Sequence, residues 1–336
     1  MKKFLLMTAI AASSILWNGC VLTQEPEGTG VDPTQVNVEV AVDLSLKLPD
    51  SEGANQDLLP EANEEYVRRF VVDAVLADGT VAQRQVAYEK NVAGKTDYSF
   101  QTKFRLNARR YSLLVWSDYV KADEQETGLY YDATSLTPVM PQGNYVGNNE
   151  RKDCFRGCAD LDLRNYRDEW AANTNIDIEL QRPVGRYEIV TTDLGAFRQR
   201  IADGLISGSE FSVRVRYADY RATAYNVLQN VPKNFLSYLF YKTNLKSENW
   251  EGDQASIVLG FDYCLVEAGE AGSKIPVEIE VLNEKNQQVS RTVLTIPVVQ
   301  GYNTVVSGRF MTGTDDGSVS VDTEFDGTVD IDLGKL

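Results

Sequence analysis

The stretch Val36-Asn37-Val38-Glu39-Val40-Ala41-Val42-Asp43-Leu44-Ser45-Leu46 decides the fold, because its large apolar residues stand at every second position. In an extended chain a two-residue period places all six on one face, so the pattern predicts a half-buried strand. Asp78-Gly79 has the composition of a hairpin turn. Similar short apolar runs predict further strands at 70–76, 98–106, 111–116, 182–190, 211–217, 237–241, 257–266, 277–282, 289–296 and 302–310.

Many short strands separated by turn residues are typical of antiparallel β-sandwiches. With 336 residues the chain has the length of about two domains, which we predict at 36–178 and 179–336. Within the first, the polar region 118–173 is expected to form long loops with short strands. In the second, Asp193 is expected to cap a short helix that runs to about Ala202 and ends at Gly204.

The composition excludes several kinds of function. There are 49 acidic and 33 basic residues, and the resulting net charge of −16 works against a nucleic-acid partner. The chain has no histidine, which excludes a Ser-His-Asp triad, a Cys-His pair and His-ligated zinc or haem. We therefore expect a binding or structural protein that is not an enzyme and uses no cofactor or metal.

The N-terminus has the features of a secretion signal. Lys2 and Lys3 precede an uncharged apolar run, 4–17, that is too short to span a bilayer, so residues 1–19 are interpreted as a signal peptide. Asn18-Gly19-Cys20 resembles the lipobox of bacterial lipoproteins, which implies that acyl chains such as palmitate anchor Cys20 in the membrane. Residues 20–35 would then be a flexible tether; ordinary cleavage that leaves Cys20 unmodified is the alternative.

Several longer stretches carry a resemblance to a known family. They resemble fimbrillin-related, fimbrial-anchor-like lipoproteins of Bacteroidales, and more narrowly a domain family of unassigned function in those bacteria. The resemblance covers residues 36 to the C-terminus and rests on strand and turn residues. The stretches are Arg68-Arg69-Phe70-Val71-Val72, Leu114-Val115-Trp116-Ser117-Asp118-Tyr119, Arg182-Pro183-Val184-Gly185-Arg186-Tyr187-Glu188-Ile189-Val190-Thr191-Thr192-Asp193-Leu194 and Ile296-Pro297-Val298-Val299-Gln300-Gly301-Tyr302-Asn303-Thr304.

This resemblance implies two tandem transthyretin-like sandwiches on a protein lipid-anchored in the outer membrane, facing the cell surface. It also implies fimbrial subunits as partners, bound by strand exchange, in which main-chain hydrogen bonds hold a donated strand. In that family an Arg-specific protease removes a first strand. Arg68-Arg69 is a candidate site for such cleavage, but we favour the alternative that the pair lies on a solvated face of a strand.

Two cysteines stand close together in Cys154-Phe155-Arg156-Gly157-Cys158. In an oxidising envelope the pair is a candidate for a small structural disulfide. Two free thiols are the main alternative, and a redox pair or half of a metal site is less favoured. Cys264 lies in an apolar stretch and is expected to be a buried hydrophobic residue.

Two further regions have both a functional and a structural interpretation. The acidic, alternating stretch 319–333 is either a strand pair for a partner or a carboxylate calcium site, or, as we favour, a terminal strand with a solvated face. A sugar-binding surface would need exposed aromatic rings, and Tyr130-Tyr131 in a polar loop is the favoured candidate. The other aromatic residues considered are Tyr119, Trp116, Trp170 and Trp250.

These observations favour a cell-surface lipoprotein with a structural or adhesive role, as an anchor or accessory subunit of a fimbrium. The alternative is a glycan-binding surface lipoprotein of a polysaccharide-uptake system. A third hypothesis, an envelope glycosidase that uses only carboxylates, is the weakest of the three.

Overall fold

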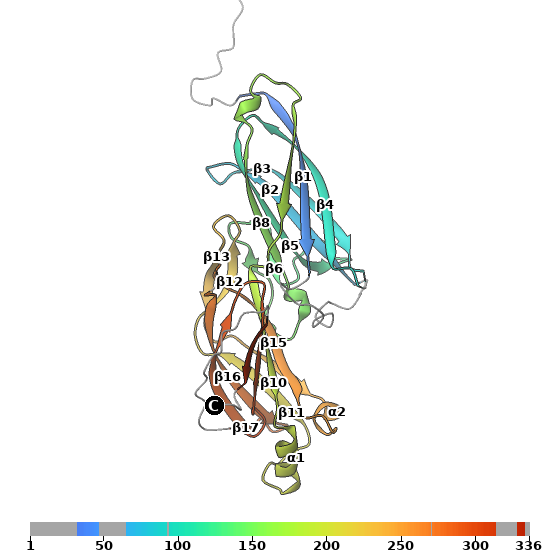
Figure 1. Ribbon diagram of the computed structural model, residues 1–336, viewed down its shortest axis with the longest axis vertical. Helices are drawn as coiled ribbons and strands as arrows, with labels where there is room; N and C mark the ends of the chain where they lie inside the picture. Colours follow the sequence, from blue (N-terminus) through green and yellow to red (C-terminus); the bar gives the residue numbers. More distant parts are fainter. Residues whose placement is uncertain (1–31, 47–64, 93, 270, 314–327, 333–336) are drawn as a thin grey trace, which may run out of the picture.

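Two β-sandwiches follow one another along the long axis of the molecule (Figure 1). The computed structural model describes residues 32–46, 65–92, 94–269, 271–313 and 328–332. The predicted signal peptide, Cys20 and residues 20–31 of the predicted tether lie outside this range, as do residues 319–327 and 333 of the acidic stretch. Among the described residues no helix is long and apolar enough to cross a membrane.

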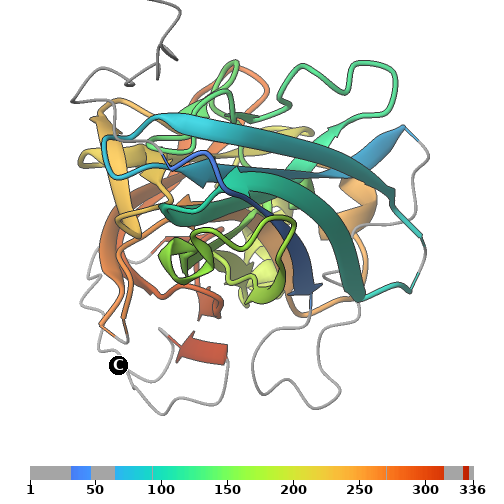
Figure 2. The ribbon, with the colours of Figure 1, turned by 90° about the horizontal axis from the view of Figure 1, so that it is seen from above.

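The first sandwich packs a three-stranded sheet on a four-stranded sheet. The first sheet has the order β4 (Asp97–Asn107), β1 (Gln35–Ser45), β9 (Asn173–Glu179), and the second has the order β3 (Val81–Lys90), β2 (Tyr66–Val75), β5 (Arg110–Lys121), β8 (Phe155–Asp162). The alternation in β1 is confirmed, because every second side chain from Val36 to Leu46 is at most 5% exposed and faces the opposite sheet. Figure 2 shows the first sandwich from above.

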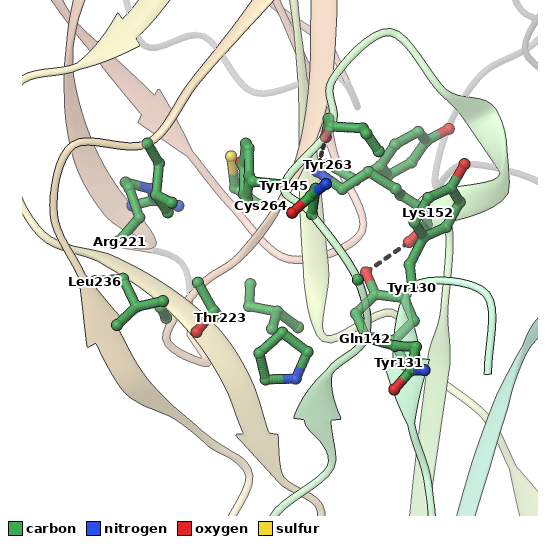
Figure 3. A pocket seen from close by; sticks show the side chains of 17 residues that line it. Tyr130, Tyr131, Gln142, Tyr145, Lys152, Arg221, Thr223, Leu236, Tyr263 and Cys264 are labelled. Atoms are coloured by element: carbon green, nitrogen blue, oxygen red, sulfur yellow. Dashed lines mark hydrogen bonds between the residues drawn. The ribbon is translucent and has the colours of Figure 1, made fainter. Parts of the chain in front are cut away.

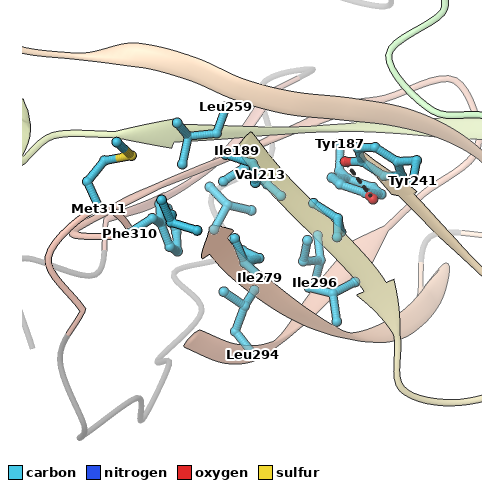
Figure 4. Packing of buried hydrophobic residues seen from close by; sticks show 14 of the residues in the cluster. Tyr187, Ile189, Val213, Tyr241, Leu259, Ile279, Leu294, Ile296, Phe310 and Met311 are labelled. Atoms are coloured by element: carbon cyan, nitrogen blue, oxygen red, sulfur yellow. Dashed lines mark hydrogen bonds between the residues drawn. The ribbon is translucent and has the colours of Figure 1, made fainter. Parts of the chain in front are cut away.

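The second sandwich packs two four-stranded sheets. Their orders are β15 (Ile257–Leu265), β10 (Val184–Thr191), β18 (Asn303–Gly308), β19 (Thr328–Asp332) and β14 (Phe240–Leu245), β11 (Phe211–Tyr217), β16 (Ser273–Asn283), β17 (Gln288–Val298). Side chains from both sheets meet in one core, with Ile189 and Leu259 on one side and Val213, Ile279 and Ile296 on the other (Figure 4).

The predicted fold class, all-β with two tandem transthyretin-like sandwiches, is confirmed. Most strand pairs are antiparallel, but β1–β9, β10–β18 and β18–β19 are parallel, which the sequence pattern did not indicate. A parallel pair needs a long crossover connection, and periodicity along one strand carries no information about that pairing.

One helix lies where it was predicted. Helix α1 (Leu194–Ala202) follows Asp193, but the Asp193 side chain does not cap it. The carboxylate instead accepts hydrogen bonds from the Thr312 backbone N–H at 2.8 Å and from the Thr191 hydroxyl at 2.5 Å. Asp193 therefore joins the start of the helix to the segment after β18. A second helix, α2 (Ser247–Trp250), is a single turn.

Several elements were not predicted. Strand β8 lies in the region expected to be mainly loop. Strands β12 (Arg221–Asn226) and β13 (Val231–Leu236) form a separate two-stranded sheet, as do the short strands β6 (Tyr131–Asp132) and β7 (Met140–Pro141). The 3-10 helices η2 (Glu150–Lys152) and η3 (Arg164–Tyr166) complete the described elements.

A third hydrophobic cluster joins the two sandwiches. It combines Val71, Trp116 and Tyr131 of the first half with Tyr225 and Tyr263 of the second. An ion pair adds to this junction: Arg182 donates to the Asp153 carboxylate at 2.9 and 3.0 Å and to the Leu46 carbonyl at 2.6 Å. The junction between the two sandwiches therefore has an apolar core of its own.

Candidate functional site

The two arginines proposed as a protease site lie inside the protein. Arg68 is 0% exposed and Arg69 6%, so the favoured prediction of a solvated face is wrong. The Arg68 guanidinium lies 4.0 Å from the centre of the Tyr119 ring, and Arg69 forms a two-point ion pair with Asp118, at 2.9 and 2.7 Å. Neither bond that follows these residues is accessible to a protease in the folded chain.

The predicted disulfide between Cys154 and Cys158 does not form in this structure. Both residues are free cysteines. They are four positions apart along extended chain at the start of β8, a separation of about 13 Å that far exceeds disulfide reach. The structure therefore favours the alternative of two free thiols. Cys264 is 2% exposed, as expected.

The aromatic residues considered for sugar binding are mostly buried. Trp116, Tyr119 and Trp250 are each at most 5% exposed, and Tyr131 is 6% exposed, so its predicted exposure is wrong. Trp170 is 64% exposed. Tyr130 and Tyr131 do line a pocket, although their rings form part of its wall rather than an open platform (Figure 3).

This pocket lies at the junction of the two halves and has a cavity volume of about 140 Å³. Its walls come from β6, from the end of β7 and residues 142–146 after it, from Lys152, and from β12, β13 and β15. Figure 3 shows Arg221, Thr223 and Leu236 on one side of the cavity and Tyr130, Gln142 and Lys152 on the other. Pockets at such junctions are common places for ligands to bind.

Behind the pocket, Asp262 is the centre of a buried polar network. Its carboxylate forms an ion pair with the Lys152 ammonium and accepts hydrogen bonds from the Tyr145 hydroxyl at 2.5 Å and the Tyr217 hydroxyl at 2.6 Å. Tyr217 in turn shares a 2.9 Å hydrogen bond with Tyr187. Burial raises the pKa of the Tyr145, Tyr187 and Tyr217 hydroxyls well above 10, so all three stay protonated.

The network also binds the short helix η2, which precedes β8, to the second sandwich. Glu150 accepts hydrogen bonds from Arg186, at 3.1 Å, and from the Tyr263 hydroxyl. Gly147 allows close approach here, because an added Cβ would lie 2.4–2.8 Å from atoms of the Tyr241 ring. The short helix η2 therefore contributes to the second sandwich although its sequence lies within the first half.

The titratable groups around the pocket are not set up for covalent chemistry. Burial raises the pKa of the Cys264 thiol, so this residue is a protonated thiol at neutral pH and a poor nucleophile. Among the described residues, no group of three or more acidic or cysteine side chains has the arrangement of a metal site. Polar and apolar side chains are mixed on both sides of the cavity.

Arg221 and Lys152, which define the two sides of this pocket, were not singled out from the sequence. Arg221 follows Ala218-Asp219-Tyr220, a turn-like stretch with no motif, and its burial results from the unpredicted hairpin β12–β13. Lys152 lies between charged neighbours in a polar loop, so nothing in the pattern distinguishes it from a solvated residue.

The chain was compared with known proteins. Residues 33–334 match a family described as a family of unknown function, DUF6562. The chain belongs to the DUF6562 family. This match confirms the resemblance to a domain family of unassigned function that the strand and turn motifs indicated. A search of curated proteins finds no match.

Similar solved structures include proteins from three bacteria. A candidate adhesin from Bacteroides ovatus is 10% identical, with a TM-score of 0.43 over 78% of this chain and 76% of that one. The fimbrial anchor protein Mfa2 from Porphyromonas gingivalis is 13% identical, with a TM-score of 0.40 over 76% and 82%. A fimbrial assembly protein from Parabacteroides distasonis is 10% identical, with a TM-score of 0.38 over 81% and 91%.

Proposed function

We propose that this member of the DUF6562 family is a lipid-anchored structural or adhesive protein of the outer membrane, exposed on the cell surface, and that it serves as an anchor or accessory subunit of a fimbrium. The observation that carries the proposal is the direction of β1. This strand begins at Gln35 and ends near Leu46, whose carbonyl contacts Arg182 at the junction of the two sandwiches.

Because β1 runs toward the junction, the N-terminal segment and the second sandwich lie at opposite ends of the molecule. A strand of 11 residues spans about 35 Å, so the start of β1 lies far from the junction, at the free end of the first sandwich (Figure 1). A tether from an acylated Cys20 would join the molecule at that end. The second sandwich would then project away from the membrane, where a partner or a surface can reach it.

The edge of the second sandwich supports strand exchange with fimbrial subunits. Strand β19 pairs in parallel with β18 over Asn303–Ser307 and with no other described strand. Such a five-residue pairing offers few main-chain hydrogen bonds, so a strand from another chain competes with it at low cost. We also propose that the domain boundary lies near residue 178, since the buried core residues of the first sandwich run from Val36 to Leu180 and those of the second from Tyr187 to Met311.

The test is affinity purification of the tagged protein from native envelopes, for the wild type, Cys20→Ser and a chain lacking residues 328–336. We expect the wild type to be membrane-bound and to co-purify with β-sandwich subunits identified by mass spectrometry. Cys20→Ser should release the protein from the membrane, and the truncation should abolish co-purification while the anchor is kept. A wild-type protein that purifies alone, or with an outer-membrane transporter, would contradict the fimbrial role.

A further inference from the structure

Arg221 is a buried cation without a counter-ion. Its side chain lines the pocket at the sandwich junction and the residue is 7% exposed. The Nη2 atom is fully buried and makes no hydrogen bond to any described residue. No ion pair joins Arg221 to a described carboxylate, and the acidic group beside it is the Cys264 thiol. The Tyr217 ring, 5.4 Å from the guanidinium, compensates only part of the charge. Because an unpaired buried charge is costly, such a residue points to an anionic ligand.

The other charges near the pocket are already paired. The Lys152 ammonium is bound to Asp262 and to the Val146 carbonyl, and Glu150 is bound to Arg186. The neighbouring Cys264 thiol is kept protonated by burial, which raises its pKa. Arg221 therefore leaves one positive charge at this pocket, in a chain whose net charge is −16.

Two polar groups of the wall already have hydrogen-bond partners within the protein. The Thr223 hydroxyl donates to the Asn234 carbonyl at 2.7 Å and accepts from the Asn234 amide at 2.8 Å. The Tyr130 hydroxyl accepts from Asn149 at 2.6 Å. The side-chain amides of Gln142 and Asn144 lie at the rim, so the group that the buried Arg221 side is built to receive is a carboxylate on an aliphatic stem, which brings few hydroxyls that need partners there.

The size and rim of the pocket fit one amino-acid side chain. A cavity of about 150 Å³ holds a guest of roughly six heavy atoms, which is the scale of a glutamate side chain. Arg221 and Leu236 are cross-strand partners in the β12–β13 hairpin. Around them Tyr220 is 64%, Leu236 41% and Tyr238 88% exposed, so the same end of the hairpin presents apolar surface to solvent.

We propose that this pocket binds an acidic side chain of an extended peptide segment from a partner protein. The carboxylate pairs with the Arg221 guanidinium, whose planar fork matches it, and apolar residues beside the acidic one pack on Leu236 and Tyr238. Binding at this site requires neither the lipid anchor nor exchange of β19. The inference therefore goes beyond the proposed function and is tested independently of it.

The test uses an array of short capped peptides, each with one Glu or Asp between apolar residues, and a matched array with Gln or Asn in its place. Hits are then titrated by calorimetry. We expect binding that depends on the carboxylate and becomes at least about tenfold weaker in Arg221→Gln. Arg291→Gln is the matched control and should bind like the wild type, because Arg291 lies on β17 and pairs with Glu278.

A second variant guards against misfolding of the first. Leu236→Asp places a negative charge on the exposed rim and should weaken binding through repulsion, while its thermal midpoint stays close to that of the wild type. Equal binding of acidic and amide peptides, absence of binding in both arrays, or unchanged binding in a folded Arg221→Gln variant would overturn the proposal. Binding of an oligouronate while all the peptides fail would overturn it in favour of a glycan.

Discussion

Lys152 and Asp262 form an ion pair between side chains that are 8% and 0% exposed, and they are 110 residues apart in the chain. Lys152 belongs to the short helix that precedes β8 of the first sandwich, and Asp262 lies in β15 of the second. The pair thus links the two halves directly. It also forms the back of the pocket, because Lys152 lines the cavity and Asp262 orients it.

Removing one partner of this pair should strongly destabilise the protein. In Lys152→Met the Asp262 carboxylate stays buried and loses its only ion-pair partner among the described residues, and we expect a loss of about 3–5 kcal/mol in the free energy of unfolding. Urea denaturation measures it. Lys246→Met is the control: the Lys246–Glu248 pair is 76% and 73% exposed and should change stability by less than about 0.5 kcal/mol. Similar losses in both variants would contradict this role.

Replacing Arg68 by methionine should leave the stability of the protein equal or higher, whereas the same change at the adjacent Arg69 should lower it. All three guanidinium nitrogens of Arg68 are buried and make no hydrogen bond to a described residue, whereas Arg69 is fully paired with Asp118. Arg68→Met removes an uncompensated charge and keeps apolar contact with Tyr119 and Phe155, so stability should stay equal or rise by about 1 kcal/mol. Arg69→Met leaves the Asp118 carboxylate buried without its ion-pair partner and should lower the free energy of unfolding by about 3–5 kcal/mol.

Chemical denaturation of both variants at pH 7 tests the contrast. The cation–π contact of Arg68 with Tyr119 is worth at most about 2 kcal/mol, less than the desolvation of a guanidinium. If Arg68→Met lost as much stability as Arg69→Met, Arg68 would have to be balanced by a partner other than the aromatic rings.

The sequence predicted the sandwiches well because burial alternates along single strands. In β1 and in the β16–β17 hairpin, burial of a side chain depends largely on whether its position along the strand is odd or even, which the sequence itself shows. The pocket could not be predicted in this way. Arg221 is buried by the hairpin β12–β13 and Lys152 by its contact with the second half, and no local pattern encodes either arrangement. Arg68 and Arg69 show the same limit, since charged residues in a strand were assigned to solvent.

The cysteines provide a separate test of the structure. In the Cys20→Ser variant the remaining three should be free thiols, and their order of reaction should follow burial. Cys158 is half-buried and should react with a maleimide first, while the buried Cys154 and Cys264 should react only on unfolding. Burial raises the pKa of all three thiols, so even Cys158 should react slowly in the folded chain. Mass spectrometry counts the labels. A Cys154–Cys158 disulfide would leave one reactive thiol in denaturant, and a reductant would then lower the thermal midpoint.

Glu280 should make stability depend on pH in the acidic range. Its carboxylate accepts a 2.7 Å hydrogen bond from Arg214, which lowers its pKa below the ordinary value of 4.5. Above pH 4.5 the group is ionised in both the folded and the unfolded chain, and the full stabilisation is present. As the pH falls below 4.5 the unfolded chain takes up a proton before the folded one, so this stabilisation is lost through the folded-state pKa.

Glu280→Gln should therefore lower the free energy of unfolding at pH 7 by up to about 1 kcal/mol, since the Arg214 partner is partly exposed. The difference from the wild type should shrink as the pH falls from 4.5 toward 3. Urea denaturation at a series of pH values measures both curves, with Glu248→Gln as a control whose pair with Lys246 is exposed. A difference that stays constant across this range would mean that Glu280 contributes through packing in β16 rather than through its charge.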